Sequence, residues 1–124
     1  MPRRPVAFIA TSDPDAARIF YGDVMGLQLQ DASPYALVYR DADIALRVQI
    51  VGKHAPPSYT VHGWEVSDLT REIEDLGRKG VVFLRFEGME QDGSGVWTTP
   101  SGDRIAWFKD PCGNILSLTQ FKMP

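Results

Sequence analysis

The sequence predicts an α+β protein made of two similar halves, each with a strand, a helix and then several further strands. The main observation is an internal repeat: a short apolar strand precedes a Ser-Asp pair in both halves, at Ser12-Asp13 and at Ser67-Asp68. Each pair opens a stretch with helical spacing of apolar residues, and extended runs between turn residues follow it. Neither half could bury both faces of its sheet alone, so we expect the two to pack together, within one chain or across a dimer.

In the first half, residues 6–11 (VAFIAT) form the opening predicted strand. Asp13 then caps a helix over about 14–24, and Pro14 fits the first helical position, where a backbone N–H is not needed. The apolar stripe of this helix consists of Ala16, Ala17, Phe20, Tyr21 and Val24. Extended runs follow at about 27–31, 35–40 and 44–51.

The second half repeats this order. Residues 61–66 (VHGWEV) predict its first strand, and Asp68 caps a helix over about 68–79 that ends at Gly80. The core-facing positions of that helix are Leu69, Ile73 and Leu76. Extended runs follow at about 82–87, 95–99, 104–109 and 115–121.

Length and composition suit a single globular domain over residues 1–124. Because 44% of the residues are hydrophobic and 23% are charged, disorder and coiled coils are poor interpretations. Within the domain we expect a first module at 1–52, a linker at 53–58 that carries two prolines, and a second module at 59–124.

Charge and cysteine usage limit the partners and the location. The chain has 13 Lys and Arg against 16 Asp and Glu, a net charge of −3, so we expect no nucleic-acid partner. Its lone cysteine, Cys112, cannot form an internal disulfide, which favours a reducing cytoplasm. The apolar run at 6–10 is too short for a signal-peptide core or a membrane span, so we expect no membrane partner either.

Three motifs occur in order, at residues 20–27 (FYGDVMGL), 63–69 (GWEVSDL) and 108–118 (FKDPCGNILSL). They resemble motifs of the vicinal oxygen chelate superfamily, which holds glyoxalase I, bleomycin-resistance proteins and extradiol dioxygenases. The first is close to that family's FY-x-D-V-L-G-L, and the last is similar to its DP-x-GN-x-x-E-L ending. The resemblance implies two βαβββ modules that form a curved mixed sheet, or cup, and it implies a homodimer.

In metal-using members of that superfamily, a His-like residue on the first strand of each module and a Glu-like residue on its last strand hold a divalent ion. The matching positions here are Val6, Val61 and Ser117, with Arg47 or Gln49 for the last strand of the first module. Valine offers no donor atom, arginine is cationic, and serine and glutamine are weak neutral ligands. We therefore expect neither a metal site of the family type nor another cofactor.

Strand alternation predicts the lining of the cup that remains, which combines apolar walls with a few polar groups. The candidate ligand-binding residues are Phe8, Arg47, Gln49, Glu65, Trp97, Trp107 and Ser117. Arg47 suits either a wet cavity with an anionic or carbonyl-bearing ligand, or a dimer seam. Glu65 is the candidate for a catalytic general base, with a structural role as the alternative.

Each of the other candidate residues has two possible roles. Gln49 and Ser117 hydrogen-bond either a ligand or neighbouring backbone. Trp97 and Trp107 are either aromatic walls of the cup or core and interface residues. Cys112 lies in a turn beside Asp110, which disfavours a thiolate, so we expect no cysteine nucleophile.

Three functions follow from this pattern. The favoured one is a metal-free protein that binds a small aromatic, amphipathic or anionic molecule, similar to the resistance and sequestration members of the family. The second is a glyoxalase-like lyase or isomerase, or a dioxygenase-like enzyme, either metal-independent or with relocated metal ligands. Glyoxalase I activity itself is disfavoured, because its mechanism needs an ion to stabilise the enediolate. The third is a structural or regulatory partner whose cup is filled by its own side chains.

Overall fold

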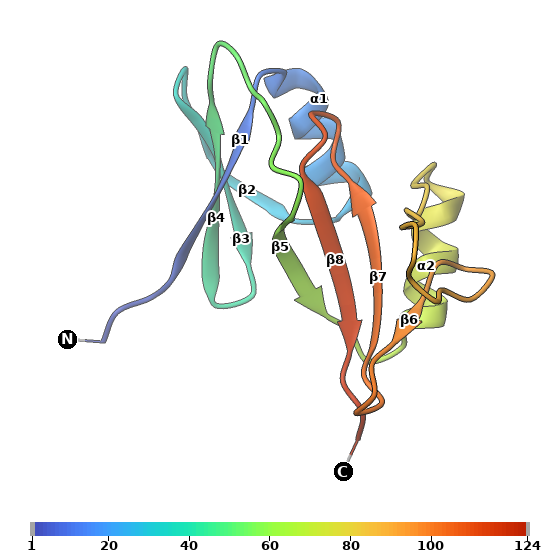
Figure 1. Ribbon diagram of the computed structural model, residues 1–124. Coiled ribbons are helices and arrows are strands. Elements are labelled where there is room, and N and C mark those ends of the chain that lie inside the picture. Colours follow the sequence, from blue (N-terminus) through green and yellow to red (C-terminus); the bar gives the residue numbers. More distant parts are fainter. Residues whose placement is uncertain (1, 124) are drawn as a thin grey trace. The chain divides into compact units, whose positions relative to one another are not determined.

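The computed structural model describes residues 2–123, and in it the chain divides into two compact units (Figure 1). The first unit comprises the chain up to Pro56 together with Asp110–Asn114, and the second comprises Pro57–Lys109 and the chain from Ile115 onward. The boundary between Pro56 and Pro57 falls inside the segment that the sequence predicts as a linker. Each unit holds one four-stranded sheet.

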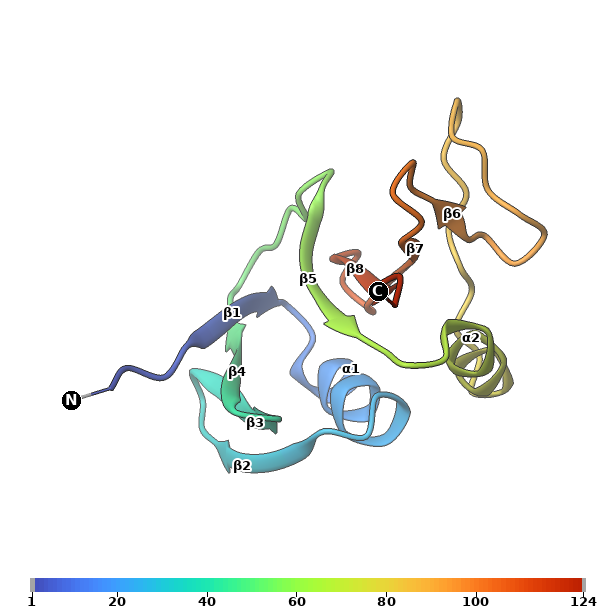
Figure 2. The ribbon, with the colours of Figure 1, turned by 90° about the horizontal axis from the view of Figure 1, so that it is seen from below.

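The first unit follows the predicted order of one strand, one helical segment and three strands. Its elements are β1 (Val6–Thr11), α1 (Pro14–Arg18), η1 (Ile19–Val24), β2 (Gln28–Ala32), β3 (Ala36–Asp41) and β4 (Ile44–Ile50). The sheet order is β1-β4-β3-β2, with β1 parallel to β4 and the other neighbours antiparallel. The helical segment lies against one face of this mixed sheet (Figure 2).

The core of the first unit follows the two-residue period of its strands. Side chains on one face are buried against the helical segment, and they are Ile9, Leu37, Tyr39, Leu46 and Val48. Ala17, Phe20 and Tyr21 complete this core from the helical side. The alternate positions of β1 point to the other face, where Val6 is 51% exposed and Phe8 is 60% exposed.

The helix predicted over 14–24 changes its winding halfway. Asp13 caps α1 as expected, because its side chain accepts a hydrogen bond from the Ala16 N–H at 3.1 Å. From Ile19 the chain is π-helical, and the Met25 N–H donates to the Phe20 carbonyl at 2.8 Å. The wider turn buries the consecutive side chains of Phe20 and Tyr21, whose rings meet edge-to-face with centroids 4.9 Å apart. Apolar spacing cannot distinguish this from an α-helix, since both windings bury neighbouring positions on one stripe.

The second unit repeats the βαβββ order, which confirms the predicted fold class. Its elements are β5 (Thr60–Glu65), α2 (Leu69–Arg78), β6 (Trp97–Thr98), β7 (Arg104–Lys109) and β8 (Ile115–Gln120). The sheet order is β5-β8-β7-β6, with β5 parallel to β8 and the other neighbours antiparallel. Asp68 caps α2 by accepting from the Arg71 N–H at 3.1 Å. None of the helices within residues 2–123 has the length and apolar character needed to cross a membrane.

One predicted strand of this unit is wrong, and another is shorter than expected. Residues 82–87 form no strand, and the run predicted at 95–99 is reduced to the two residues of β6. One backbone hydrogen bond, from the Leu84 N–H to the Trp107 carbonyl at 2.8 Å, joins the first of these segments to β7.

The Gln91 side chain takes the place of the backbone hydrogen bonds that a neighbouring strand would make with this segment. The Gln91 amide donates to the carbonyls of Leu84 and Gly95, at 2.9 and 2.8 Å, and its oxygen accepts from the Phe86 N–H at 2.7 Å. These backbone groups are therefore satisfied by Gln91 rather than by a neighbouring strand. The apolar pattern of residues 82–86 predicts a strand, but it contains no sign of a glutamine several residues away that takes the place of one.

The buried carboxylate of Asp110 organises the turn Asp110–Asn114. One oxygen accepts from the backbone N–H groups of Cys112 and Asn114, both at 2.9 Å. The other accepts from the Tyr21 hydroxyl at 2.6 Å and from the Asn114 amide at 2.8 Å. Burial, reinforced by the Asp110 charge and hydrogen bond, raises the pKa of Tyr21 far above its ordinary value, so Tyr21 remains a donor.

Asn114 extends this network to two further segments of the first unit. Its amide nitrogen also donates to the Ala10 carbonyl of β1 at 2.8 Å. The Asn114 amide oxygen lies 2.8 Å from His54 Nε2. An amide oxygen can only accept a hydrogen bond, so Nε2 is the donor. The His54 ring therefore carries a proton on Nε2, which fixes its tautomer when it is neutral.

Two buried tyrosines of the first unit provide a matched test of this network. The Tyr39 hydroxyl is buried and has no hydrogen-bond partner among residues 2–123, whereas the Tyr21 hydroxyl donates to Asp110. Tyr21→Phe should lower the free energy of unfolding by about 1.5–3 kcal/mol, because it removes a hydrogen bond to a buried carboxylate. Tyr39→Phe should change it by less than about 0.5 kcal/mol or raise it, because an unpaired polar group leaves the core. Urea denaturation at neutral pH measures both, and equal losses would contradict the assignment.

Candidate functional site

Each sheet has one face that its own helix does not cover, which we call the open face of that sheet. On the first sheet, Phe8 of β1 and Arg47 of β4 are register partners, and Val38 of β3 lies on the other side of Arg47. The next row along the strands pairs Ala10 with Gln49. The structure therefore places Phe8, Arg47 and Gln49 on one face as neighbours, with Val6 beyond Phe8 along β1.

The open face of the second sheet carries the remaining candidates in two rows. Ser117 of β8 is flanked by Gly63 of β5 and Trp107 of β7. In the next row, Thr119 is flanked by Glu65 and Ile105, and Ile105 is in turn opposite Trp97. Ser117 and Trp107 are therefore direct neighbours, whereas Glu65 and Trp97 lie on the two outer strands.

Gly63 is required by its neighbour in the sheet. A Cβ atom at this position would lie 2.3 Å from Ser117 Oγ, closer than real Cβ atoms come to any neighbour, and 3.1 Å from the Ser117 carbonyl oxygen, which is tighter than most real Cβ contacts. The Ser117 hydroxyl thus occupies the space over the Gly63 backbone, and a larger residue at either position would displace the other.

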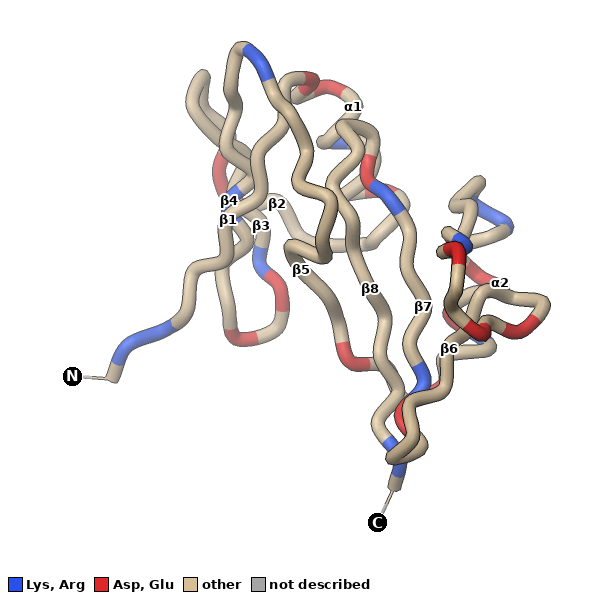
Figure 3. Tube along the Cα trace, viewed as in Figure 1, with Lys and Arg blue, Asp and Glu red and all other residues tan. Residues whose placement is uncertain are grey.

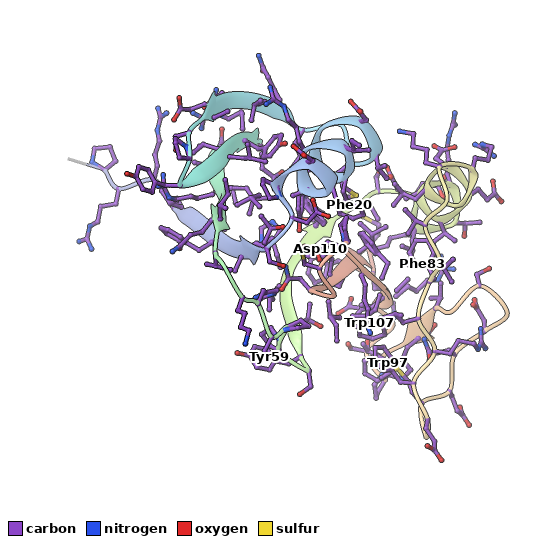
Figure 4. All side chains as sticks on the ribbon, turned by 90° about the horizontal axis from the view of Figure 1, so that it is seen from above. Phe20, Tyr59, Phe83, Trp97, Trp107 and Asp110 are labelled. Carbon is purple, nitrogen blue, oxygen red and sulfur yellow. The ribbon has the colours of Figure 1, made fainter. Side chains whose placement is uncertain are left out.

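Trp107 is the centre of an aromatic patch formed with Phe86 and Trp97. The Trp107 ring lies 6.3 Å from Trp97 at an interplanar angle of 31°, and it meets Phe86 edge-to-face with centroids 5.4 Å apart. Figure 4 shows Trp97 and Trp107 close together on their two strands. All three side chains are only partly buried, so part of their ring surface is accessible to a ligand.

The orientation of Trp107 is fixed by a residue that sequence analysis missed. The indole Nε1–H donates to the Thr60 hydroxyl at 3.0 Å. The register of β5 against β8 shifts between Thr60 and His62, so Val61 is the extra residue of a bulge. Simple alternation from position 61 could not foresee that Thr60 reaches Trp107, and Phe86 was missed because its segment resembled an ordinary strand.

The opposite face of the second sheet is core. Trp64 stacks on Phe108 with centroids 6.4 Å apart, and Phe83 packs on the same Phe108 ring at 5.5 Å. His62 meets Trp64 edge-to-face at 4.8 Å, so it lies with the core residues rather than on the open face. Trp64 is therefore chemically similar to Trp107 but sits on the other side of the same sheet.

The surroundings of Cys112 correct one expectation from the sequence. The sulfur lies 3.2 Å from Thr11 Oγ1 and 3.7 Å from Ser12 Oγ. Burial by itself raises the pKa of Cys112, but hydrogen bonds from the Thr11 and Ser12 side chains and from the backbone of Ser12 and Asp13 outweigh it, and the pKa is lowered overall. The expectation that this turn disfavours a thiolate is wrong, because the β1–α1 connection supplies donors that sequence proximity did not reveal.

The two βαβββ units define the fold class of the vicinal oxygen chelate proteins. Residues 4–118 match the model of the Glyoxalase/Bleomycin resistance protein/Dioxygenase superfamily, and the chain belongs to this superfamily. A search of curated protein sequences found no match.

Similar solved structures cover nearly the whole chain. TnmS3, an antibiotic binding protein from Streptomyces sp. CB03234, is 24% identical with a TM-score of 0.74, over 98% of each chain. A superfamily member from Sphaerobacter thermophilus DSM 20745 is 20% identical, with the same TM-score and coverage. Lactoylglutathione lyase from Agrobacterium tumefaciens is 15% identical with a TM-score of 0.74, over 97% of this chain and 94% of that chain. At these identities the likeness shows the fold, and the fold alone does not decide between binding and catalysis.

The residues at the family's metal positions do not fit a divalent ion. Val6 and Val61 carry no donor atom, and Ser117 faces the Gly63 backbone. Within residues 2–123, no three or more His, Cys, Asp and Glu side chains gather in a way that could hold a metal. These positions therefore do not supply the ligand set of the family's metal site.

The lowered pKa of Cys112 predicts how this thiol reacts. The rate of alkylation by iodoacetamide should rise with pH and reach its midpoint below that of a cysteine in an unfolded peptide, because the thiolate is the nucleophile. Thr11→Val removes the side-chain donor and should move the midpoint upward. Mass spectrometry of the intact protein at timed intervals gives the rates, with thermal melting to verify that the variant is folded. A midpoint that is unchanged by Thr11→Val would contradict the role of the Thr11 hydroxyl.

Proposed function

We propose that this chain is a metal-free binding protein for a small aromatic, amphipathic or anionic molecule, of the resistance or sequestration type. The aromatic patch of Phe86, Trp97 and Trp107 is the observation that carries the proposal. It offers partly exposed rings on the open face of a sheet, with one indole held in place by Thr60. Stacking of a ring on such a surface contributes about 0.5–1.5 kcal/mol beyond the burial of area.

The open face of the first sheet supports the same function with different chemistry. Phe8 is 60% exposed and Val6 is 51% exposed, and exposed apolar side chains that gather on one face often mark a binding surface. Arg47 beside Phe8 can hold a carboxylate, a phosphate or a carbonyl oxygen through its planar guanidinium. The proposed ligand contacts are Phe8, Arg47, Gln49, Glu65, Trp97, Trp107 and Ser117.

The comparisons support a binding function without deciding it. TnmS3, whose fold is similar over its whole length, is an antibiotic binding protein. Valine at positions 6 and 61 favours binding over metal-dependent catalysis in this chain, because a ligand held there would meet no electrophilic ion. Glu65, on the outer strand β5, remains the candidate for a general base if the protein is an enzyme.

We also propose a cytoplasmic homodimer that requires neither nucleic acid nor a membrane as a partner. The single free cysteine, Cys112, suits a reducing compartment. A net charge of −3 does not favour binding to nucleic acid.

The binding proposal is tested with 8-anilinonaphthalene-1-sulfonate, a molecule that is aromatic, amphipathic and anionic at once. Trp107→Phe and Trp97→Ala should each weaken its binding about tenfold, because stacking surface is lost at the patch. Trp64→Phe is the matched control, since this tryptophan lies on the core face of the same sheet, and it should leave the affinity within about twofold. Fluorescence titration gives the affinities, and thermal melting verifies the fold of each variant.

A second readout is the melting temperature of the native chain in a screen of aromatic, amphipathic and anionic compounds. A compound present at 100 times its Kd stabilises the folded state by about 2.7 kcal/mol. No stabilising compound in any of these classes, or equal effects of the Trp64 and Trp107 variants, would contradict the proposal. A stoichiometric amount of Ni, Zn, Mn or Fe in protein purified without chelators would contradict its metal-free character.

The homodimer is tested by size-exclusion chromatography with light scattering. The expected mass is twice the 13.8 kDa of the chain, across a concentration range that spans the micromolar region. A mass that stays at 13.8 kDa at every concentration would contradict the dimer.

A further inference from the structure

The first unit contains an arginine-lined groove that shares no residue with the proposed ligand contacts. Its volume is about 510 Å³, and its lining residues are Arg3, Arg4, Pro5, Arg40, Ala42 and Asp43. Three of the six are arginines and one is a carboxylate, whereas the chain as a whole carries a net charge of −3. Figure 3 shows the basic segment of the arm that precedes β1 and the charged turn between β3 and β4.

Residues 3–5, which we call the arm, form one wall of this groove. Pro5 follows the two arginines in sequence, and proline restricts its own backbone and that of the preceding residue, which here is Arg4. The Pro5 carbonyl accepts a hydrogen bond from the Ala45 N–H at 3.4 Å, which attaches the arm to the start of β4. Arg4 therefore has a restricted backbone next to the attached Pro5, which lowers the entropy lost when its side chain binds an anion.

The turn between β3 and β4 forms the other wall. Arg40 lies near the end of β3, and its guanidinium donates to Gln30 Oε1 at 3.2 Å, which orients the group and leaves further N–H donors for a ligand. Ala42 adopts a positive φ of 51°, a conformation that allows the chain to reverse within this short turn. The reversal places Arg40 and Asp43 along the same groove.

Charge distinguishes this groove from another charged surface of the chain. The groove along α2 is lined by Asp68, Thr70, Arg71, Glu74, Asp75 and Arg78. Its two arginines face three carboxylates, and Arg78 forms an ion pair with Asp75, so its cations are compensated from within. The residues that line the arm groove include three arginines and one carboxylate, Asp43, a formal excess of two positive charges within the lining that an anion can neutralise.

We propose that the arm groove binds the phosphate group of a small phosphorylated molecule. A phosphate monoester carries a charge close to −2 at neutral pH, which matches the excess of the groove, and its oxygens accept paired N–H donors from guanidinium groups. A groove of about 510 Å³ is larger than phosphate alone, so an organic group has room beside it. This site is separate from the aromatic patch, and its existence does not depend on the function proposed above.

The test is an NMR titration of the ¹⁵N-labelled chain with inorganic phosphate, phenyl phosphate, succinate and phenol, at an ionic strength held constant with NaCl. Inorganic phosphate should cause saturable shifts in the amide signals of residues 3–4 and 40–43. Phenyl phosphate should bind at least about threefold more tightly than inorganic phosphate, because the organic group adds contacts. Succinate should bind more weakly than phosphate, and phenol should not shift these signals.

Variants assign the binding to the arginines. The double variant Arg3→Gln and Arg4→Gln should raise the Kd for phosphate about tenfold, and Arg40→Gln should have a similar effect. Arg71→Gln makes the same change of charge on α2 and should leave the Kd within about twofold. Trp107→Phe, which weakens binding at the aromatic patch, should leave the phosphate Kd unchanged, so a failure of one proposal is distinguished from a failure of the other. Because the arm lies outside the core, the double variant should melt at the temperature of the native chain.

Three outcomes would overturn the proposal. The first is the absence of a saturable shift beyond that caused by NaCl. The second is an Arg71→Gln effect as large as that of the arm variant, which would mean diffuse attraction rather than a site. The third is binding of succinate as tight as that of phosphate, which would exclude a preference for phosphate.

Discussion

The Asp110 carboxylate is the interaction on which the first unit depends. It is buried, and a buried carboxylate is costly unless its oxygens are hydrogen-bonded. Here each oxygen receives two donors, from the backbone of its own turn, from Tyr21 and from Asn114. Asn114 continues the network to β1 and to His54. As a result, a turn that lies between β7 and β8 in the sequence belongs to the first compact unit.

This network also explains why the family motifs are informative about the fold. Tyr21 belongs to the first motif, and Asp110 and Asn114 belong to the last, far apart in the sequence. In the structure, these residues are hydrogen-bonded to one another around a single carboxylate. The motifs therefore encode a structural interaction, and the residues that would decide chemistry lie elsewhere, on the open faces of the sheets.

Local rules predicted most elements, and the exceptions share one physical cause. Helix caps at Asp13 and Asp68 and the two-residue period of β1 depend only on nearby residues, so the sequence predicts them correctly. The π-helical turn, the loop held by Gln91 and the contact of Thr60 with Trp107 depend on which distant groups meet in the folded chain. The pKa of Cys112 belongs to the same class, since its principal donor, Thr11, is about a hundred residues away.

The side chains whose hydrogen bonds hold the first unit together and the side chains on the open faces of the sheets belong to different residues. Valine at positions 6 and 61 alters the chemistry available on the open faces, but neither side chain takes part in the hydrogen bonds around Asp110. The same scaffold can therefore present a metal ligand, an aromatic ring or an arginine without a change in the interactions that hold it together. In this chain the surface carries the partly buried rings around Trp107 and the arginines that line the arm groove. Both features suit the binding functions proposed above, because rings stack on aromatic guests and guanidinium groups bind anions.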